Sequence, residues 1–378
     1  MKRILLLSLC LLTFSFQPTW GQKKALAESR NVIQRTTGKS NLPISLVLKP
    51  GKGKLEGKTF FKYRVDHGVL KIEGNSPVAL CRGFYDFVKS NHAGLYSWSG
   101  NNIRFPQQLT EGTAKEVTSP FAHHYMFNVC TYGYSMPYWD WERWEKEIDW
   151  MALHCIDMPL ALVGYEAIIA RVWKKMGLTD EEINSYFVGP AHLPWMRMGN
   201  VSGIDGPLNE DWHRQQIALQ HKILNRMKSL GMKPICPGFP GFIPEAFKRI
   251  YPDLHIIQTH WGGAFCNWMI SPQEELFSKI GTAFIREWEK EFGMSIIWWT
   301  VSTKWTFLFL PRAQKSVMNC LPPMAIKFIS PFVRETLMPY GLCKAGCLAT
   351  NATSGIMKLW EPWFPKCLTT KCFCWIWQ

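Results

Sequence analysis

The chain has 378 residues, of which 47% are hydrophobic and 19% are charged, and this balance excludes a disordered, collagen-like or coiled-coil protein. The formal net charge is +14, which on its own suggests nucleic acid or an anionic membrane as a partner. The 19 Trp residues are an unusual number, and their flat indole rings point instead to an aromatic or carbohydrate-binding cleft.

The first residues have the pattern of a secretory signal. A basic start, Met1 to Arg3, precedes an apolar run from Ile4 to Phe14 that is too short to cross a bilayer. We expect residues 1–21 to be cleaved, which predicts a secreted or periplasmic protein without a membrane span. Five widely scattered cysteines lie between this signal and residue 293, which favours individual thiols over a disulfide framework.

Residues 22–115 are predicted to form a small accessory α/β domain. Short alternating strands are expected at 42–48, 60–65 and 68–74, separated by Gly, Lys and Asp-His-Gly turns. The segment 76–91 then shows the apolar spacing of an amphipathic helix, with Ser76 as its N-cap.

From about residue 120 to residue 293 the pattern changes to repeated strands, loops and helices. Strands or extended segments are expected at 123–130, 157–164, 232–238 and 253–261. Helices are expected at 139–155, 166–175, 179–187, 211–230, 244–250 and 271–293, the last with an N-terminal cap. This alternation predicts a parallel sheet. No glycine fingerprint follows a strand, so the first half of a (β/α)8 TIM barrel fits better than a doubly wound sheet.

In such a barrel the functional site gathers at the carboxyl ends of the strands. The candidates there are Asn128, Cys130, Glu166, Trp195 and Trp261. Taken singly, each has a plainer interpretation: the tryptophans as core residues, the cysteine as an inert thiol, and the glutamate as a charge that the helix dipole favours. Taken together, they predict an aromatic, hydrogen-bonding cleft. We expect no metal and no cofactor, because His123 and His124 cannot place two ligands on one strand face.

Several segments resemble the α-N-acetylglucosaminidases of glycoside hydrolase family 89. The most specific are NVCTYGYSMPYWDWERWEKEIDWMAL, GPAHLPWMRMGN and FIREWEKEFG, which run colinearly with GYEAI, GLTDEEINSYFV, DGPL and GMKPICPGFPGFIPEAF. The resemblance implies a TIM barrel that releases terminal α-linked N-acetylglucosamine from glycans, acting from the non-reducing end with retention. It also implies that Asn128, Cys130, Glu166, Trp195 and Trp261 line the sugar subsite. One departure is His154-Cys155, where the family tends to have Asn-Gly.

Retaining hydrolysis needs two carboxylates about 5 Å apart. In the resembling family the acid/base belongs to an Asn-Glu-Met sequence soon after the FIREWEKEFG helix, whereas here no acidic residue follows until Glu335. Trp is always encoded by TGG, and the codons for Thr and Lys begin with AC and AA. If the reading frame starts one nucleotide earlier, the codons from Trp298 to Thr306 can therefore encode Val-Asp-Ser-Phe-Asn-Glu-Met-Asp. We therefore hypothesise a frameshift near residue 294, with the acid/base encoded across Thr303-Lys304.

Residues 294–378 have the composition of an out-of-frame tail. They hold six of the 12 Cys and seven of the 19 Trp, and only two acids against nine Lys and Arg. An alternative is a zinc-binding module, since thiolates at short spacings bind zinc. Its ligands would be Cys343, Cys347, Cys367, Cys372 and Cys374.

The function expected of the gene is therefore an exo-acting retaining glycosidase whose partner is a glycan with terminal α-linked N-acetylglucosamine. The chain as written should be inactive, because both catalytic Glu residues are missing, and half a barrel should expose sheet edges and lower solubility. A secreted, non-catalytic glycan-binding protein is the alternative. Residues 22–293 carry a net charge of only +5, which needs no nucleic acid. The sequence leaves the oligomeric state open.

Overall fold

The computed structural model describes residues 20–293 and 296–298. The apolar run of the expected signal, the Thr303-Lys304 junction and the cysteine-rich tail lie outside the described residues. The described chain divides into two compact units. The first runs through His123 and adds residues 147–157 and 228–232, and the second comprises residues 124–146, 158–227 and the chain from Lys233 onward.

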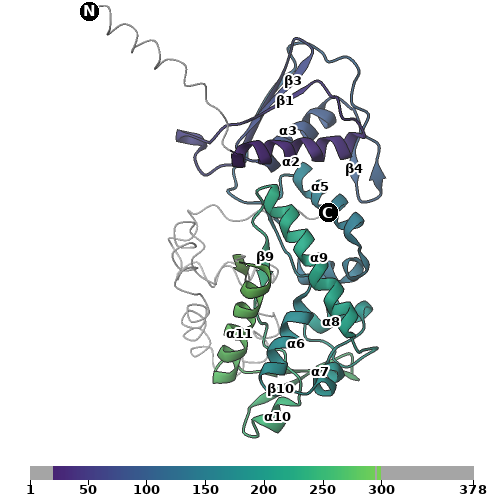
Figure 1. Ribbon diagram of the computed structural model, residues 1–378, viewed down its shortest axis with the longest axis vertical. Coiled ribbons are helices and arrows are strands. Elements are labelled where there is room, and N and C mark those ends of the chain that lie inside the picture. The colour runs from purple at the N-terminus through teal and green to yellow at the C-terminus, as the bar shows by residue number, and fades with distance from the viewer. Residues whose placement is uncertain (1–19, 294–295, 299–378) are drawn as a thin grey trace, which may run out of the picture. The chain divides into compact units, whose positions relative to one another are not determined.

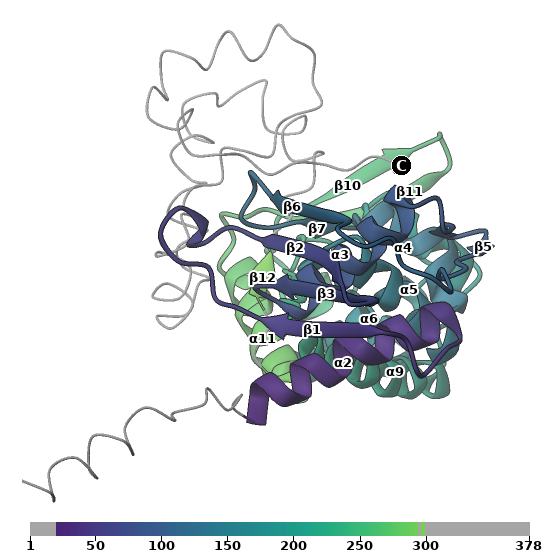
Figure 2. The same ribbon diagram turned by 90° about the horizontal axis from the view of Figure 1, so that it is seen from above.

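The first unit is built on a four-stranded sheet with the order β1-β3-β2-β6 (Figure 2). Its strands are β1 (Ile44–Leu48), β2 (Phe60–Asp66), β3 (Val69–Gly74) and β6 (Ala114–Thr118). β1 runs parallel to β3, and β2 runs antiparallel to both β3 and β6. The first three strands confirm the prediction. β6 was not predicted, and it extends past residue 115.

Two helices, α2 (Trp20–Thr37) and α3 (Pro77–Ser90), pack on each other, and α3 packs on the sheet. The predicted cap of α3 is confirmed, because the Ser76 side chain accepts a hydrogen bond from the backbone N–H of Ala79. The apolar face of α3 is buried, with Phe84 fully inaccessible to solvent. α2 was not predicted, because its sequence is largely polar and lacks a clear apolar stripe.

The second unit contains four short parallel strands whose spatial order follows their chain order. They are β7 (Tyr125–Met126), β8 (Met158–Pro159), β9 (Ile235–Pro237) and β12 (Ile296–Trp298). β7 pairs with β8, a parallel bridge joins Leu160 to Ile235, and β9 pairs with β12. Parallel neighbours connected through helices are the arrangement of the first half of a (β/α)8 barrel, as predicted.

Helices follow the strands of this second unit much as the sequence predicted. They are α6 (Tyr165–Lys175), α7 (Asp180–Tyr186), α9 (Glu210–Ser229), which ends in the first unit, and α11 (Glu275–Phe292). α5 (Trp141–Leu153) begins in the second unit and ends in the first. α6 and α11 pack side by side (Figure 1), with the rings of Tyr165 and Phe284 5.1 Å apart. No helix among the described residues is both long and apolar enough to cross a membrane.

The extended segment expected at 253–261 is confirmed as β10 (Ile256–Trp261), which forms an antiparallel hairpin with the unpredicted β11 (Phe265–Ile270) and is not part of the barrel sheet. Two other expectations in this region were wrong. The strand expected at 123–130 ends at Met126, since the following residues turn into a helix. α11 begins at Glu275 rather than at Ser271, and its N-cap, Glu274, makes no side-chain capping bond.

Candidate functional site

The first two predicted site residues lie at the start of a short helix, α4 (Val129–Ser135), which follows β7. Asn128 is the N-cap: its Oδ1 accepts a hydrogen bond from the Thr131 backbone N–H at 2.8 Å, and the Thr131 hydroxyl closes the capping box. Cys130 lies within the helix and is half-buried. Its Sγ lies 3.6 Å from the phenol oxygen of Tyr134, and this side-chain hydrogen bond raises the pKa of Tyr134 above its ordinary value.

Trp195 lies on α8 (Leu193–Arg197), another short helix, which packs closely on α4. The approach is close because Gly133 has no side chain. A Cβ at that position would lie 2.7 Å from Cβ and from Cδ of Pro194. The contact between Gly133 and Pro194 therefore brings Trp195 next to Tyr134, whose ring centroid is 6.1 Å away at an interplanar angle of 77°.

Four aromatic side chains form what we call the aromatic cluster: Tyr134, Trp195, Trp261 and Phe265. Trp195 and Trp261 stack with their ring centroids 4.9 Å apart and their planes at 23°. Trp261 in turn contacts Phe265, with centroids 5.9 Å apart. Tyr134, Trp261 and Phe265 are exposed, by 52%, 39% and 40% respectively. The cluster is thus a surface on which a flat apolar ligand face can stack.

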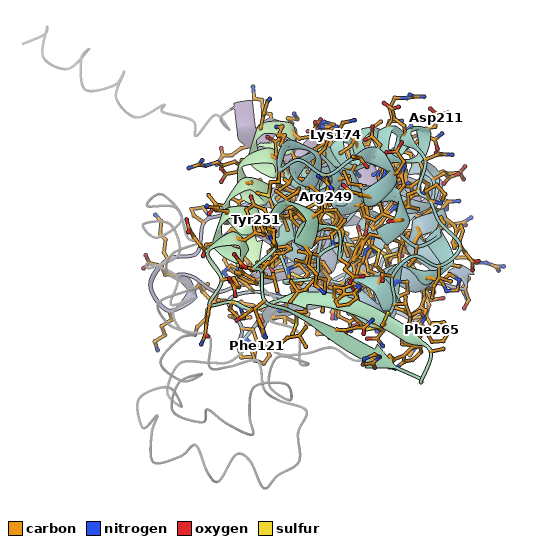
Figure 3. All side chains as sticks on the ribbon, turned by 90° about the horizontal axis from the view of Figure 1, so that it is seen from below. Phe121, Lys174, Asp211, Arg249, Tyr251 and Phe265 are labelled. Carbon is orange, nitrogen blue, oxygen red and sulfur yellow. The ribbon has the colours of Figure 1, made fainter. Side chains whose placement is uncertain are left out.

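The hairpin that carries Trp261 and Phe265 is fixed along its length by two side-chain hydrogen bonds. Thr259 donates its hydroxyl hydrogen to the carbonyl oxygen of Gly199 at 3.0 Å, and Asn267 donates from Nδ2 to the carbonyl oxygen of Val201 at 2.9 Å. Both Thr259 and Asn267 are buried. These bonds tie the hairpin to the segment that directly follows α8, so both tryptophans of the cluster are positioned by one stretch of chain. Phe265 lies at the exposed end of the hairpin (Figure 3).

Glu166, the only carboxylate among the predicted site residues, is in the interior. It lies in the first turn of α6, two residues after the N-cap Gly164, whose left-handed φ is 80°. Its side chain is fully buried and forms a bidentate salt bridge with Arg197, with Nε–Oε1 at 2.6 Å and Nη2–Oε2 at 2.9 Å. Removing one partner of such a buried pair typically costs about 3–5 kcal/mol, because the other charge is left unpaired.

Buried phenols surround this ion pair. Tyr132, on α4, accepts a hydrogen bond from the Leu162 backbone N–H at 3.2 Å, and Tyr165 precedes Glu166 on α6. Burial raises the pKa of both phenols above their ordinary value, so both remain neutral at physiological pH. The ion pair between Glu166 and Arg197 therefore has neutral phenols beside it.

The structure thus brings Cys130, Trp195 and Trp261 together through Tyr134. It places Asn128 at the beginning of the same helix and Glu166 in the interior. The sequence interpretation missed Tyr134, Phe265 and Arg197. Tyr134 is four residues after Cys130 and Arg197 two after Trp195, inside segments already singled out, so the spacing on a helix could have identified Tyr134. Among the described residues, no group of His, Cys, Asp or Glu is arranged to hold a metal ion.

Two domain families match this chain. The domain described as the alpha-N-acetylglucosaminidase (NAGLU) N-terminal domain matches residues 27–110, and the NAGLU tim-barrel domain matches residues 124–302. Human alpha-N-acetylglucosaminidase is 42% identical over 236 residues, which is 61% of this chain and 32% of the human protein.

Solved structures give a concordant result. The family 89 glycoside hydrolase from Clostridium perfringens, as a double variant in complex with its substrate GlcNAc-alpha-1,4-galactose, is 28% identical with a TM-score of 0.69, over 75% of this chain and 33% of that one. The same enzyme in complex with PUGNAc has a TM-score of 0.68 at 28% identity, over 73% of this chain and 32% of that one. The chain therefore spans about a third of the length of these relatives.

Proposed function

The chain belongs to the alpha-N-acetylglucosaminidase family of glycosidases, and from that premise we propose that it recognises terminal α-linked N-acetylglucosamine on glycans. The observation that carries the proposal is the aromatic cluster, in which the stacked Trp195 and Trp261 lie next to Tyr134 of α4, the helix that follows β7. A pyranose ring has one face of C–H groups, and exposed aromatic rings bind such faces while excluding water. Asn128 and Cys130 would supply polar contacts at the edge of that ring.

For the gene as a whole we propose exo-acting, retaining hydrolysis of this sugar linkage. The chemistry requires an acid/base and a nucleophile, both carboxylates. Glu166 does not meet this need, because it is fully buried and engaged by Arg197 on both oxygens. No other acidic residue occurs between Glu291 and Glu335, so the chain as written has no carboxylate shortly after β12.

A change of reading frame would account for the missing carboxylate after β12. The tim-barrel match ends at residue 302, one residue before the Thr303-Lys304 junction where the shifted frame can encode Glu. β12 pairs with β9 through Trp298, so the junction follows the carboxyl end of the fourth parallel strand, where barrel enzymes carry catalytic residues. The coding DNA decides the matter, because the idea fails unless the codons of Thr303 and Lys304 spell GAA across their boundary.

The expected result for the present chain is therefore no turnover of 4-nitrophenyl α-N-acetylglucosaminide. Normal turnover by the purified protein would refute the proposed inactivity. A gene in which one nucleotide is inserted near codon 294, so that translation continues in the shifted frame, should regain hydrolysis, and failure to do so despite a folded product would count against the frameshift.

A second candidate function is glycan binding without catalysis. The aromatic cluster favours it, because three of its four rings are exposed while the neighbouring carboxylate is buried. Saturable binding of N-acetylglucosamine by this chain without hydrolysis would support this function. Absence of saturable binding together with absence of turnover would remove both candidates for the chain as written.

A further inference from the structure

The helix that carries Trp195 is tied to the protein interior by the buried ion pair between Arg197 and Glu166. We infer that this pair is a positioning device: it fixes the rotation of α8 and thereby holds the Trp195 indole in its place within the aromatic cluster. The inference rests on the proposed function, because it concerns the ring on which the sugar would stack. It gives Glu166 a role through Arg197 rather than by contact with the sugar.

The geometry of the pair restricts rotation. Nε and Nη2 of Arg197 each donate to a different oxygen of Glu166, so the guanidinium plane and the carboxylate plane are locked together. Arg197 follows Trp195 by two residues on a helix of five. A rotation of α8 that moved the indole would therefore break at least one of these two bonds.

The other end of the pair is equally well fixed. Glu166 belongs to the first turn of α6 and has no solvent-accessible surface. On the side of α4, the contact between Gly133 and Pro194 limits how closely α8 can approach. The steric contact sets a distance, whereas the ion pair sets an orientation, so the two together define where Trp195 lies.

Stability alone is a poor explanation for this pair. Two charges that leave water lose much of their hydration, and apolar residues of similar volume often replace buried ion pairs without loss of stability. The third nitrogen of the guanidinium, Nη1, is buried and has no hydrogen-bond partner among the described residues, which adds to the cost. A costly pair that ties α8 to α6 is better explained by the geometry that it enforces.

The same unit offers a matched control. Arg249 forms a bidentate salt bridge of the same kind with Glu182, with Nε–Oε1 at 2.6 Å and Nη2–Oε2 at 2.7 Å. There the arginine side chain is 53% exposed, and the pair joins α10 (Phe247–Ile250) to α7. Arg249 and Phe265 are well separated in Figure 3, so this pair is remote from the exposed end of the cluster.

The experiment uses the full chain labelled with 5-fluorotryptophan, with the Trp195 fluorine resonance assigned through Trp195→Phe. The test variant is the double substitution Glu166→Met with Arg197→Met, which removes the charges and keeps the volume. We expect an unfolding midpoint equal to or above that of the unmodified chain. The Trp195 resonance should nevertheless shift or broaden, and the Kd for free N-acetylglucosamine should rise about tenfold, as when the supporting partner of a binding group is lost.

Two further variants complete the design. Glu182→Met with Arg249→Met should leave the Trp195 resonance and the Kd unchanged. Arg197→Lys keeps the charge but loses the planar bidentate contact, so it should move the Trp195 resonance in the same direction as the double substitution. If the double variant does not fold, Arg197→Lys tests the inference on its own.

An unchanged Trp195 resonance in a folded variant at Glu166 or Arg197 would overturn the inference. The resonance answers this question whether or not the sugar binds. If the unmodified chain does not bind N-acetylglucosamine, the proposed function fails while the positioning role is still decided by the spectrum.

Discussion

The indole rings of Trp195 and Trp261 stack with their centroids 4.9 Å apart, although one ring comes from the short helix α8 and the other from the hairpin β10–β11. Each ring covers one face of the other, so a sugar must stack on an outer face of the pair or separate the two rings. Because the hairpin is hydrogen-bonded to the segment after α8, the pair is held as one surface rather than as two independent rings.

The first prediction concerns this surface. Trp261→Ala should weaken binding of N-acetylglucosamine by about tenfold, since loss of one aromatic contact is worth about 0.5–1.5 kcal/mol beyond the buried area. It should also remove the exciton signal of the stacked indoles from the circular dichroism spectrum. Trp212→Ala is the control, because that ring contacts His213 instead. Equal binding by the Trp261 variant and the unmodified chain, measured by titration calorimetry, would contradict a role in the site.

The second prediction concerns the contact between α4 and α8. Gly133→Ala would normally favour a helix by about 1 kcal/mol, but here the new Cβ would lie 2.7 Å from Pro194. We expect a net loss of about 1–3 kcal/mol in the free energy of unfolding, together with weaker sugar binding, because α8 must move. Ser135→Ala, an exposed change on the same helix, should stay within about 0.5 kcal/mol. Urea unfolding of both variants gives the comparison, and a stabilised Gly133 variant would disprove the close contact.

The third prediction concerns pH. Burial lowers the pKa of His154 to about 4 despite its bond to the Trp150 carbonyl oxygen, and Arg82 and Lys89 add to the lowering. The unfolded chain binds a proton at this residue near pH 6.5, whereas the folded chain does not. Stability is therefore complete above pH 6.5 and falls as the pH drops towards 4, by about 3 kcal/mol at most.

The variant His154→Asn keeps a donor for the Trp150 carbonyl oxygen and removes the titration. The unfolding free energy of this variant should change less between pH 6.5 and pH 4 than that of the unmodified chain. Carboxylates titrate in both proteins, so the difference between the two slopes is the measurement. Parallel slopes would show that His154 is protonated in the folded chain.

The fourth prediction concerns the neighbouring Cys155, which is 7% exposed and has a left-handed φ of 63°. This backbone region costs a non-glycine residue about 1–2 kcal/mol. Cys155→Ala removes the buried thiol but keeps the strain, whereas Cys155→Gly removes both. We expect the glycine variant to be the more stable of the two by about 1 kcal/mol, although it loses more atoms. Thermal unfolding of the two variants tests this ranking. An alanine variant that is more stable than the glycine variant would contradict the prediction.

Much of the fold could be predicted from local patterns. Ser76 marked the beginning of α3, and the apolar run before Gly164 marked a buried strand that leads to α6. The hairpin could not be separated from a barrel strand, because Ile256 to Trp261 is extended in either case and only its partner β11 distinguishes them. α2 was not predicted because its sequence has no periodic apolar pattern, and its packing against α3 is visible only in the structure.

The candidate site was predicted as a set of residues but not as an arrangement. Asn128 and Cys130 were expected at the carboxyl end of a strand over 123–130, whereas the capping bond between Asn128 and Thr131 places them at the start of a helix. Glu166 was expected in the cleft because it follows the carboxyl end of the second predicted strand. Its burial depends on Arg197, a partner distant in the sequence that no local pattern reveals.

The five residues of α8 serve both the aromatic cluster and the interior. Trp195 contributes to the outer surface, whereas Arg197 reaches a charge in the interior. Selection for a different ligand and selection for a stable core therefore act on the same short segment. In a library that randomises this helix, few variants should change recognition without loss of fold, whereas substitutions at the tip of the hairpin, near Phe265, should alter specificity at little cost to folding. New specificities in this protein are thus more accessible from the hairpin than from the helix.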